Sequence, residues 1–336
     1  MEPFTLERPS GIAGVVALGA QAGRNDAAAE YIAGGTDMIQ LLQENVRRPT
    51  RLVDLTAGTA GLDDRIEIGQ AGALRLGALA TMTTTAEHRL VRENFPVISQ
   101  SLLASASQQV RNAATIAGNL LQRTRCVYFR DVGFAACNKR APGSGCSALE
   151  GENRGHAILG TSDNCIATHA SDFAVALAAL DGRLRLRGPR GERVVPVLEF
   201  HRLPGDAPHI EAALEPGEVI VAIEVPASAA ARRSYYLKVR DRASFEFALV
   251  SAAVGLDLEG DRIREARVAM GGVGTKPWRL PAVEEALRGK LPDAVTFRAA
   301  AGRAAEGATP RAHNAFKVEL MKRTLVRALE TVGGRA

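Results

Sequence analysis

The chain of 336 residues has four cysteines, and all of them lie between positions 126 and 165. They are separated by ten, eight and eighteen residues: Cys126, Cys137, Cys146 and Cys165. Thiolates are soft ligands, and a group of four is typical of iron–sulfur clusters or of zinc. A zinc site usually contains two cysteines only about two to four residues apart, and the chain has no such pair. The wide spacing therefore favours a [4Fe–4S] cluster, with zinc, two disulfides or free thiols as the alternatives.

The segment that carries the cysteines, residues 122–168, lacks a regular hydrophobic period and is rich in basic residues. These are Arg123, Arg125, Arg130, Lys139, Arg140 and Arg154. Their charges would stabilise anionic thiolates, or else simply keep an exposed loop in solution. His156 and His169 flank the cysteines. We interpret both as hydrogen-bonding loop residues rather than ligands, because four thiols already complete a ligand set.

A second motif is the glycine turn AGGTD at residues 33–37, which follows an apolar strand at 31–33 and precedes an apolar helix at 38–42. Because glycine has no Cβ, such a turn lets an anion approach the backbone N–H groups, as in phosphate sites. An ordinary strand-to-helix turn has the same pattern. The turn matches neither a Walker loop nor the dinucleotide fingerprint, so by itself it identifies no ligand.

The composition excludes several classes of function. Hydrophobic residues make up 46% and charged residues 24%, the mix of a globular protein rather than a disordered one. The net charge of +5 arises from 42 basic and 37 acidic residues spread along the chain, and only 4% of residues are aromatic, so we expect no nucleic-acid partner. The apolar run at 173–180 is less than half of the ~20 residues that a membrane helix needs. Residues 1–9 contain acids and prolines and do not resemble a signal peptide.

The elements that must position these motifs fall into two blocks. Hydrophobic alternation predicts strands at 51–55, 65–69, 74–77, 184–187, 192–195 and 217–226 in the first. Helices are expected at 84–93, 95–110 and 172–180. After a linker at 227–233, the second block has strands at 234–239, 248–258 and 263–270 and then helices from 281 to the end. Strands followed by helices predict an α+β domain.

Further motifs follow the glycine turn in a fixed order. They are LGALAT at 76–81, QVRNAATIAGNL at 109–120, SDFA at 171–174 and NAFKV at 314–318. This series resembles the FAD-binding medium subunits of the xanthine dehydrogenase family of molybdenum hydroxylases, over nearly the whole chain. The cysteine insertion is similar to that of the FAD subunits of bacterial aldehyde oxidoreductases, which also hold a [4Fe–4S] cluster. The medium subunit of 4-hydroxybenzoyl-CoA reductases is a more distant relative with a similar insertion.

The resemblance implies a fold of the α+β class with two domains. Residues 1–226 would form a two-lobed FAD-binding domain of the PCMH/VAO type, with lobes at about 1–57 and 58–226. The [4Fe–4S] loop at 122–168 would be an insertion in the second lobe. Residues 227–336 would form an α+β C-terminal domain of the CO dehydrogenase flavoprotein type, an antiparallel sheet with helices.

The resemblance also implies which residues bind FAD. The backbone around the glycine turn would wrap the pyrophosphate, through Ile32, Ala33, Gly34, Gly35, Thr36, Asp37, Met38 and Ile39. The ribityl and phosphate region would be lined by Thr115, Gly118 and Asn119, and Ser105 is a further expected contact. Asp172 would hydrogen-bond the flavin, and Ile220 would pack near the isoalloxazine. Lys238 would lie close to the ring, where a cation favours the anionic reduced flavin.

The implied function is electron transfer within a heterotrimeric complex. In the family, a molybdenum cofactor on a large subunit oxidises the substrate, here expected to be an aldehyde. Electrons then pass through two [2Fe–2S] centres on a small subunit to FAD and on to oxygen, a quinone or a ferredoxin. This chain would need no catalytic acid or base. The complex would lie in the periplasm, exported with a partner that carries a twin-arginine signal, or in the cytoplasm.

Three other functions are alternatives. The chain could be the medium subunit of a 4-hydroxybenzoyl-CoA reductase-like enzyme or of another hydroxylase in the family. A self-contained flavin oxidase would need its own acid–base residues, yet the sequence has no HExxH, no Ser-His-Asp order and no paired carboxylates. A zinc-stabilised scaffold without flavin would use the cysteines alone.

Overall fold

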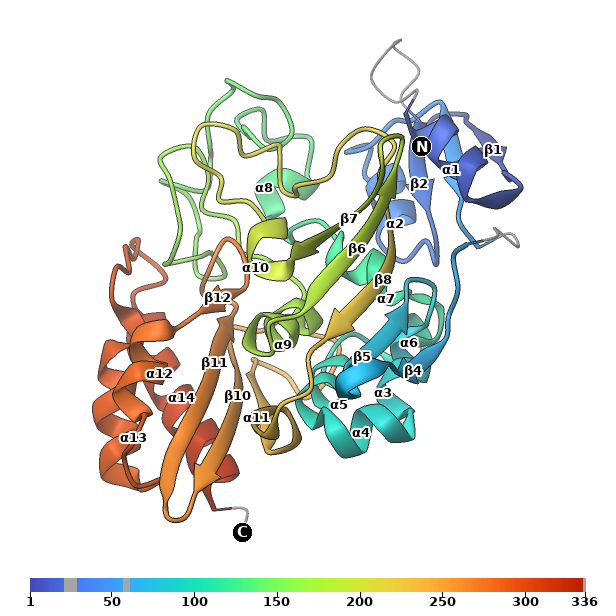
Figure 1. Cartoon of the computed structure of the whole chain (residues 1–336). Coiled ribbons are helices and arrows are strands. Elements are labelled where there is room, and N and C mark those ends of the chain that lie inside the picture. Colours follow the sequence, from blue (N-terminus) through green and yellow to red (C-terminus); the bar gives the residue numbers. More distant parts are fainter. Residues whose placement is uncertain (21–28, 57–60, 335–336) are drawn as a thin grey trace.

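In a computed structural model, which describes residues 1–20, 29–56 and 61–334, the chain folds into three sheets with helices around them. The first sheet has the strand order β1-β3-β2, the second β4-β5-β8-β6-β7, and the third β12-β11-β10-β9. Figure 1 shows the first sheet at the N-terminal end of the molecule and the third sheet, with its helices, at the opposite side. The expected boundary between two lobes, near residues 57 and 58, lies outside the described residues.

The first sheet is small and parallel. β3 (Arg51–Asp54) lies in its centre, between β1 (Thr5–Glu7) and β2 (Ala29–Ile32). The chain leaves β2 through the glycine turn and enters α2 (Met38–Gln43), as the sequence predicts. β1 and α1 (Gly11–Gly19) precede them and were not predicted from the sequence.

The second sheet is antiparallel and joins strands that are distant in sequence. β8 (Val219–Val225) pairs with β5 (Leu74–Gly77) on one side and with β6 (Arg183–Gly188) on the other. The two edge strands are β4 (Ile66–Ile68) and β7 (Gly191–Pro196).

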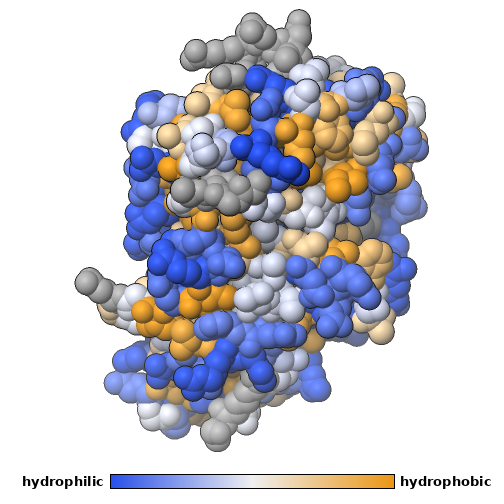
Figure 2. Space-filling view, turned by 90° about the vertical axis from the view of Figure 1, so that its right-hand side faces the viewer, coloured by the Kyte–Doolittle hydropathy of each residue, from blue (hydrophilic) through white to orange (hydrophobic). Residues whose placement is uncertain are grey.

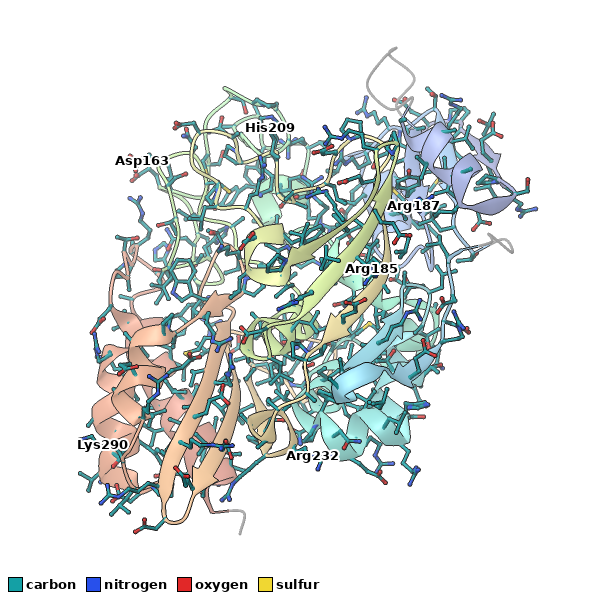
Figure 3. The ribbon with its side chains drawn as sticks, viewed as in Figure 1. Asp163, Arg185, Arg187, His209, Arg232 and Lys290 are labelled. Atoms are coloured by element: carbon teal, nitrogen blue, oxygen red, sulfur yellow. The ribbon has the colours of Figure 1, made fainter. Side chains whose placement is uncertain are left out.

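Side chains alternate across this second sheet as expected for a half-buried strand. On β6, Leu184 and Leu186 are buried. Arg185 and Arg187 project from the other face of β6 (Figure 3), where Arg185 forms an ion pair with Glu224 at 2.7 Å.

Helices cover the buried face and form the largest hydrophobic core. The core helix is α9 (Asp172–Ala179), in which every residue is buried and which packs against α5 (Pro96–Leu103) and against three strands of the third sheet. α7 (Ile116–Leu120) and α10 (Val197–Phe200) also pack against α9, whereas α3 (Met82–Glu87) and α4 (Arg89–Asn94) pack against α5, and α6 (Gln108–Ala113) packs against α3.

The long helices that the sequence predicted at 84–93 and 95–110 are interrupted. His88 adopts an extended backbone conformation between α3 and α4, and so does Ser107 before α6, where its hydroxyl caps the helix. Periodicity alone does not mark such breaks, because the apolar pattern continues across them.

The third sheet is built from β9 (Ser234–Val239), β10 (Val250–Glu259), β11 (Arg262–Gly271) and β12 (Trp278–Arg279). Its helices are α12 (Pro281–Leu287), α13 (Ala294–Ala301) and α14 (Phe316–Gly333), and the apolar face of α14 packs against β10. The predicted linker at 227–233 is not plain coil. It contains the short helix α11 (Ala229–Arg232), because Ser228 caps the helix and two of its alanines are buried.

The segment at 122–168 is irregular, as predicted, apart from the one-turn helix α8 (Val127–Arg130). In Figure 1 its loops lie above the third sheet and beside α10. On the face that Figure 2 shows, hydrophobic residues are interspersed with hydrophilic ones. Within the described ranges, no helix is both long and apolar enough to cross a membrane.

The central place of α9 in the core gives a test of stability. Leu177 is fully buried there, and truncation of a buried leucine leaves a cavity. We expect Leu177→Ala to lower the free energy of unfolding by about 2–5 kcal/mol, measured by urea denaturation. The control is Val295→Ala on α13, whose side chain is 70% exposed and whose loss should change stability by less than about 0.5 kcal/mol. Equal effects of the two variants would contradict the assignment of α9 as the core helix.

Candidate functional site

A large cavity of about 920 Å³ opens between the first sheet, the second sheet and the loops of the cysteine segment. Its volume is at the upper end of the usual range for small-molecule and cofactor sites, about 300–1,000 Å³. Its wall includes nearly all of the residues expected to bind FAD: Ile32, Ala33, Gly34, Gly35, Thr36, Asp37, Met38, Ser105, Thr115, Gly118, Asn119, Asp172, Ile220 and Lys238. Ile39 does not line it, and its side chain lies on the outside of α2, 45% exposed.

The glycine turn forms one wall of the cavity. Gly35 has φ +73°, a left-handed conformation that glycine adopts without strain. At Gly34 a Cβ atom would lie only 1.9 Å from the carbonyl oxygen of Ala113, at the end of α6. The turn therefore touches the α6–α7 connection with its bare backbone, and the wall would change shape if Gly34 carried a side chain.

The starts of two helices, α7 and α9, also line the cavity. Thr115 caps α7 by accepting a hydrogen bond from the N–H of Gly118 at 3.2 Å. Ser171 caps α9 in the same way, since its Oγ accepts from the N–H of Ala174 at 3.0 Å. The Ser171 hydroxyl also donates to Oδ1 of Asn119 at 2.6 Å, which ties the two helix starts together.

Asp172, the first residue of α9, is buried among three donors. Its Oδ2 accepts from the Ser105 hydroxyl at 2.8 Å and from Nζ of Lys238 at 2.7 Å, while Oδ1 accepts from the Tyr236 hydroxyl at 2.6 Å. The Lys238 side chain is 3% exposed. Burial, together with the charge of Asp172, raises the pKa of Tyr236 well above its usual range, so the phenol remains a donor.

The structure thus brings three predicted residues into one cluster and adds Tyr236, which the sequence analysis missed. A signal was present, because Tyr236 precedes Lys238 by two positions on β9, and residues two apart on a strand share a face. Lys238 also donates to the carbonyl of Ala104 at 3.2 Å.

Asp37 has a second role besides its place in the cavity wall. Its carboxylate accepts a hydrogen bond from the backbone N–H of Arg123 at 2.8 Å and forms ion pairs with Arg125 and Arg130, at 2.8 and 2.7 Å. Asp37 therefore fastens the start of the cysteine segment to the first sheet. Arg125 also lies over the ring of Phe247, with its Cζ atom 5.0 Å from the ring centroid.

Glu211 anchors the same segment to the loop that precedes β8. It forms ion pairs with Arg123 and with Lys139, the latter at 2.6 Å. Burial alone would raise the pKa of Glu211, but these two cations outweigh it and hold the pKa below its usual range. Glu211, Arg123 and Lys139 all line the cavity.

Two neutral histidines lie next to each other on the cavity wall. The rings of His169 and His201 meet edge to face, with centroids 4.3 Å apart. Burial lowers the pKa of His169 to about 4 and that of His201 well below its usual range. His169 accepts a hydrogen bond at Nδ1 from the N–H of Ser171 at 3.3 Å, in keeping with its interpretation as a hydrogen-bonding loop residue.

The four cysteines are unbridged, so the two disulfides considered above are not formed. Cys137 and Cys146 face each other as an antiparallel backbone bridge. Cys137 and Cys165 are buried, and Cys126 and Cys146 are partly buried. The pKa of Cys126 is raised to about 12, mainly by burial and in smaller part by the charges that Cys165 and Cys137 would carry.

The pKa of Cys165 is raised too, mainly by burial, and the charges that Cys146 and Cys137 would carry also raise it. The four thiols therefore lie close enough to affect one another electrostatically. Among the residues that the structure describes, no three His, Cys, Asp or Glu side chains are grouped around a single point that could hold one metal ion. Cys165 is also part of the cavity wall.

The chain matches two known families in succession. Residues 2–228 match the FAD binding domain in molybdopterin dehydrogenase, and residues 235–332 match the CO dehydrogenase flavoprotein C-terminal domain. The chain is 46% identical to the aldehyde oxidoreductase FAD-binding subunit of Escherichia coli strain K12 over 338 residues, which cover 100% of both chains. It is 24% identical to the carbon monoxide dehydrogenase medium chain of Afipia carboxidovorans over 280 residues, 82% of this chain and 76% of that one.

Solved structures agree with this fold. Quinoline 2-oxidoreductase from Pseudomonas putida 86 contains a chain with a TM-score of 0.75 and 26% identity, over 99% of this chain and 97% of that chain. Reconstituted CO dehydrogenase from Oligotropha carboxidovorans gives a TM-score of 0.76 over 100% of both chains, at 22% identity. The predicted α+β fold class is confirmed. The chain therefore belongs to the FAD-binding medium subunits of the molybdenum hydroxylases and is a subunit of an oxidoreductase of the xanthine dehydrogenase and aldehyde oxidoreductase type.

Proposed function

We propose that this chain is the FAD- and [4Fe–4S]-binding electron-transfer subunit of a molybdenum-dependent aldehyde oxidoreductase. The observation that carries the proposal is a single cavity whose wall runs from the glycine turn, past Asp172 and Lys238, to Cys165. One wall thus joins the glycine turn, a buried cation and one of the four thiols of the cysteine segment. The 46% identity to the aldehyde oxidoreductase FAD-binding subunit of Escherichia coli supports aldehydes as the substrate class of the complex.

The residues of the wall fit a dinucleotide with a long polar chain. The bare backbone at Gly34 and Gly35 offers an approach for the pyrophosphate, and the α7 start at Thr115 and Gly118 offers a second polar wall. At the other end, Asp172 fixes the ammonium of Lys238, which would favour negative charge on a neighbouring flavin ring. FAD, when bound, accepts electrons singly and releases them in pairs.

The cysteines fit a multi-iron cluster by their chemistry. Four thiols of one segment share an electrostatic neighbourhood, and all four are free of disulfides. Burial raises the pKa of Cys126 and of Cys165, so a positive iron centre would supply the charge that makes thiolates stable there. The cluster would relay electrons or staple the long loop to the body of the chain.

The remaining parts of the proposal concern the complex. The chain would bind a large subunit with the molybdenum cofactor and a small subunit with two [2Fe–2S] centres, and it would deliver electrons to oxygen, a quinone or a ferredoxin. Residues 1–226 would act as the FAD-binding domain and 227–336 as the C-terminal domain. The compartment would be the periplasm, by export with a signal-bearing partner, or the cytoplasm.

A reductase of the 4-hydroxybenzoyl-CoA type is the second candidate, favoured only by the presence of a cysteine insertion at 122–168. The two functions differ in the substrate that the assembled complex turns over. Purification of the full complex and assay with an aldehyde, and separately with an aromatic acyl-CoA, distinguishes them.

The cysteine site is tested by iron analysis of the purified full chain. We expect about four irons per chain and flavin absorption near ~450 nm together with a broad shoulder from the cluster. Cys146→Ser should lose the iron and the shoulder but keep the flavin, because Cys146 does not line the cavity. The matched control, Ser147→Ala, should keep both. Zinc in place of iron in the unaltered chain would refute the cluster, and absence of flavin would refute the whole proposal.

The glycine turn is tested by the affinity for FAD. In Gly34→Val the new side chain would collide with the carbonyl of Ala113 and displace the turn. We expect FAD to bind at least about tenfold more weakly, equal to about 1.4 kcal/mol, in a fluorescence titration of the deflavinated chain. Gly302→Ala is the control, because a Cβ there meets nothing within 4 Å. Unchanged FAD affinity in Gly34→Val would remove the turn from the flavin site.

The buried ion pair is tested by unfolding. Lys238→Met leaves the Asp172 carboxylate buried without its cation, and breaking such a pair costs about 3–5 kcal/mol. We expect that loss in the free energy of unfolding, determined with urea. Lys290→Met removes an exposed lysine from the outer side of the C-terminal helices (Figure 3) and should have almost no effect. If both variants unfold at the same urea concentration, the pair does not stabilise the site.

A further inference from the structure

Lys317, in the NAFKV motif near the C-terminus, is fully buried in the first turn of α14. Its ammonium group has three N–H donors, and each one has a carbonyl acceptor. The acceptors are the backbone oxygens of Gly155 at 3.1 Å, His156 at 3.0 Å and Gly272 at 2.6 Å. Two of the three belong to the cysteine segment, so a residue of the C-terminal helix holds that segment from 161 and 162 positions away.

Asn314, one turn earlier, holds the same stretch. It is fully buried, and its Nδ2 donates to the carbonyls of Ala157 at 3.2 Å and His156 at 3.4 Å. Its own Oδ1 accepts from the N–H of Arg311 at 2.6 Å. Asn314 and Lys317 together therefore fix three consecutive carbonyls, those of residues 155–157.

The residue in the middle of this stretch reaches a cysteine. Nε2 of His156 lies 3.2 Å from Sγ of Cys126. The other ring nitrogen, Nδ1, is buried and has no partner in the part of the chain that the structure describes. A proton on Nδ1 would therefore be buried without an acceptor, whereas a proton on Nε2 is used by the sulfur. We therefore assign the proton to Nε2, so that the Nε2–H of His156 donates a hydrogen bond to Sγ of Cys126.

We propose that Asn314 and Lys317 are positioning residues for the cysteine site, which hold His156 so that its Nε2–H donates to the sulfur of Cys126. The inference rests on the proposed function where that sulfur binds a cluster. A hydrogen bond to a ligand sulfur stabilises its negative charge, and outer contacts of this kind tune both metal affinity and reduction potential. The C-terminal helix thereby acts on the cluster through one histidine.

The test uses the full chain with variants in His156 and Lys317. His156→Leu removes the donor, whereas His156→Gln places an amide N–H where Nε2 lies and should rescue. We expect His156→Leu and Lys317→Met to weaken retention of iron against a chelator by about 10- to 100-fold and to lower the midpoint potential of the cluster. His156→Gln and Lys290→Met should stay close to the unaltered chain. Bound flavin, measured in every variant, shows that the fold is intact.

Separate outcomes refute the two proposals. If the unaltered chain holds no cluster, the iron part of the proposed function fails. The positioning role is then read from the rate at which iodoacetamide alkylates Cys126, which should rise in Lys317→Met and His156→Leu but not in Lys290→Met. If a cluster is present and His156→Leu leaves its retention and potential unchanged, the positioning role is wrong while the proposed function stands. If Lys317→Met does not fold, the Leu and Gln variants of His156 decide the matter alone.

Discussion

A carboxylate can be buried beside a cofactor cavity only if its charge is matched, and Asp172 shows how the fold meets this requirement. Its donors are Ser105, which follows α5, and Tyr236 and Lys238 on β9, so two distant parts of the chain converge on a side chain at the start of α9. Removing any of them leaves polar groups without partners in a dry interior. The start of α9, the position of β9 and the shape of this end of the cavity therefore depend on the same pair of charges.

Matched charges also attach the cysteine segment to the rest of the chain. A long irregular loop cannot hold its position through backbone pairing, because it has little regular structure. On one side, Asp37 and Glu211 form ion pairs with arginines of the segment and with Lys139. On the other side, Lys317 donates hydrogen bonds to backbone carbonyls. Such partly buried pairs are weakly screened by salt. The loop is thus held from the first sheet and from the C-terminal helix at once.

Much of the architecture could be predicted because it depends on local patterns. The apolar run at 173–180 predicts a buried helix, and the glycine turn between strand and helix follows from its residues alone. The grouping of the cysteines in one segment was visible in the spacing. The breaks at His88 and Ser107 were not, since they depend on what the flanking helices pack against rather than on the local pattern.

The partners of the site residues were the least predictable part. Glu211 reaches Lys139 across 72 positions and Lys317 reaches His156 across 161, and no sequence periodicity reports such distances. Tyr236 was closer to prediction, because strand geometry places it on the same face as Lys238. Composition and spacing identify which groups must find partners, and the tertiary fold decides which partners they find.

A short stretch of chain connects Cys165 to Asp172. Both residues lie on the wall of one cavity, and they are seven positions apart. Even fully extended, seven residues span at most about 25 Å. The covalent chain therefore limits how far Cys165 can lie from Asp172. This limit holds for any arrangement of the surrounding loops.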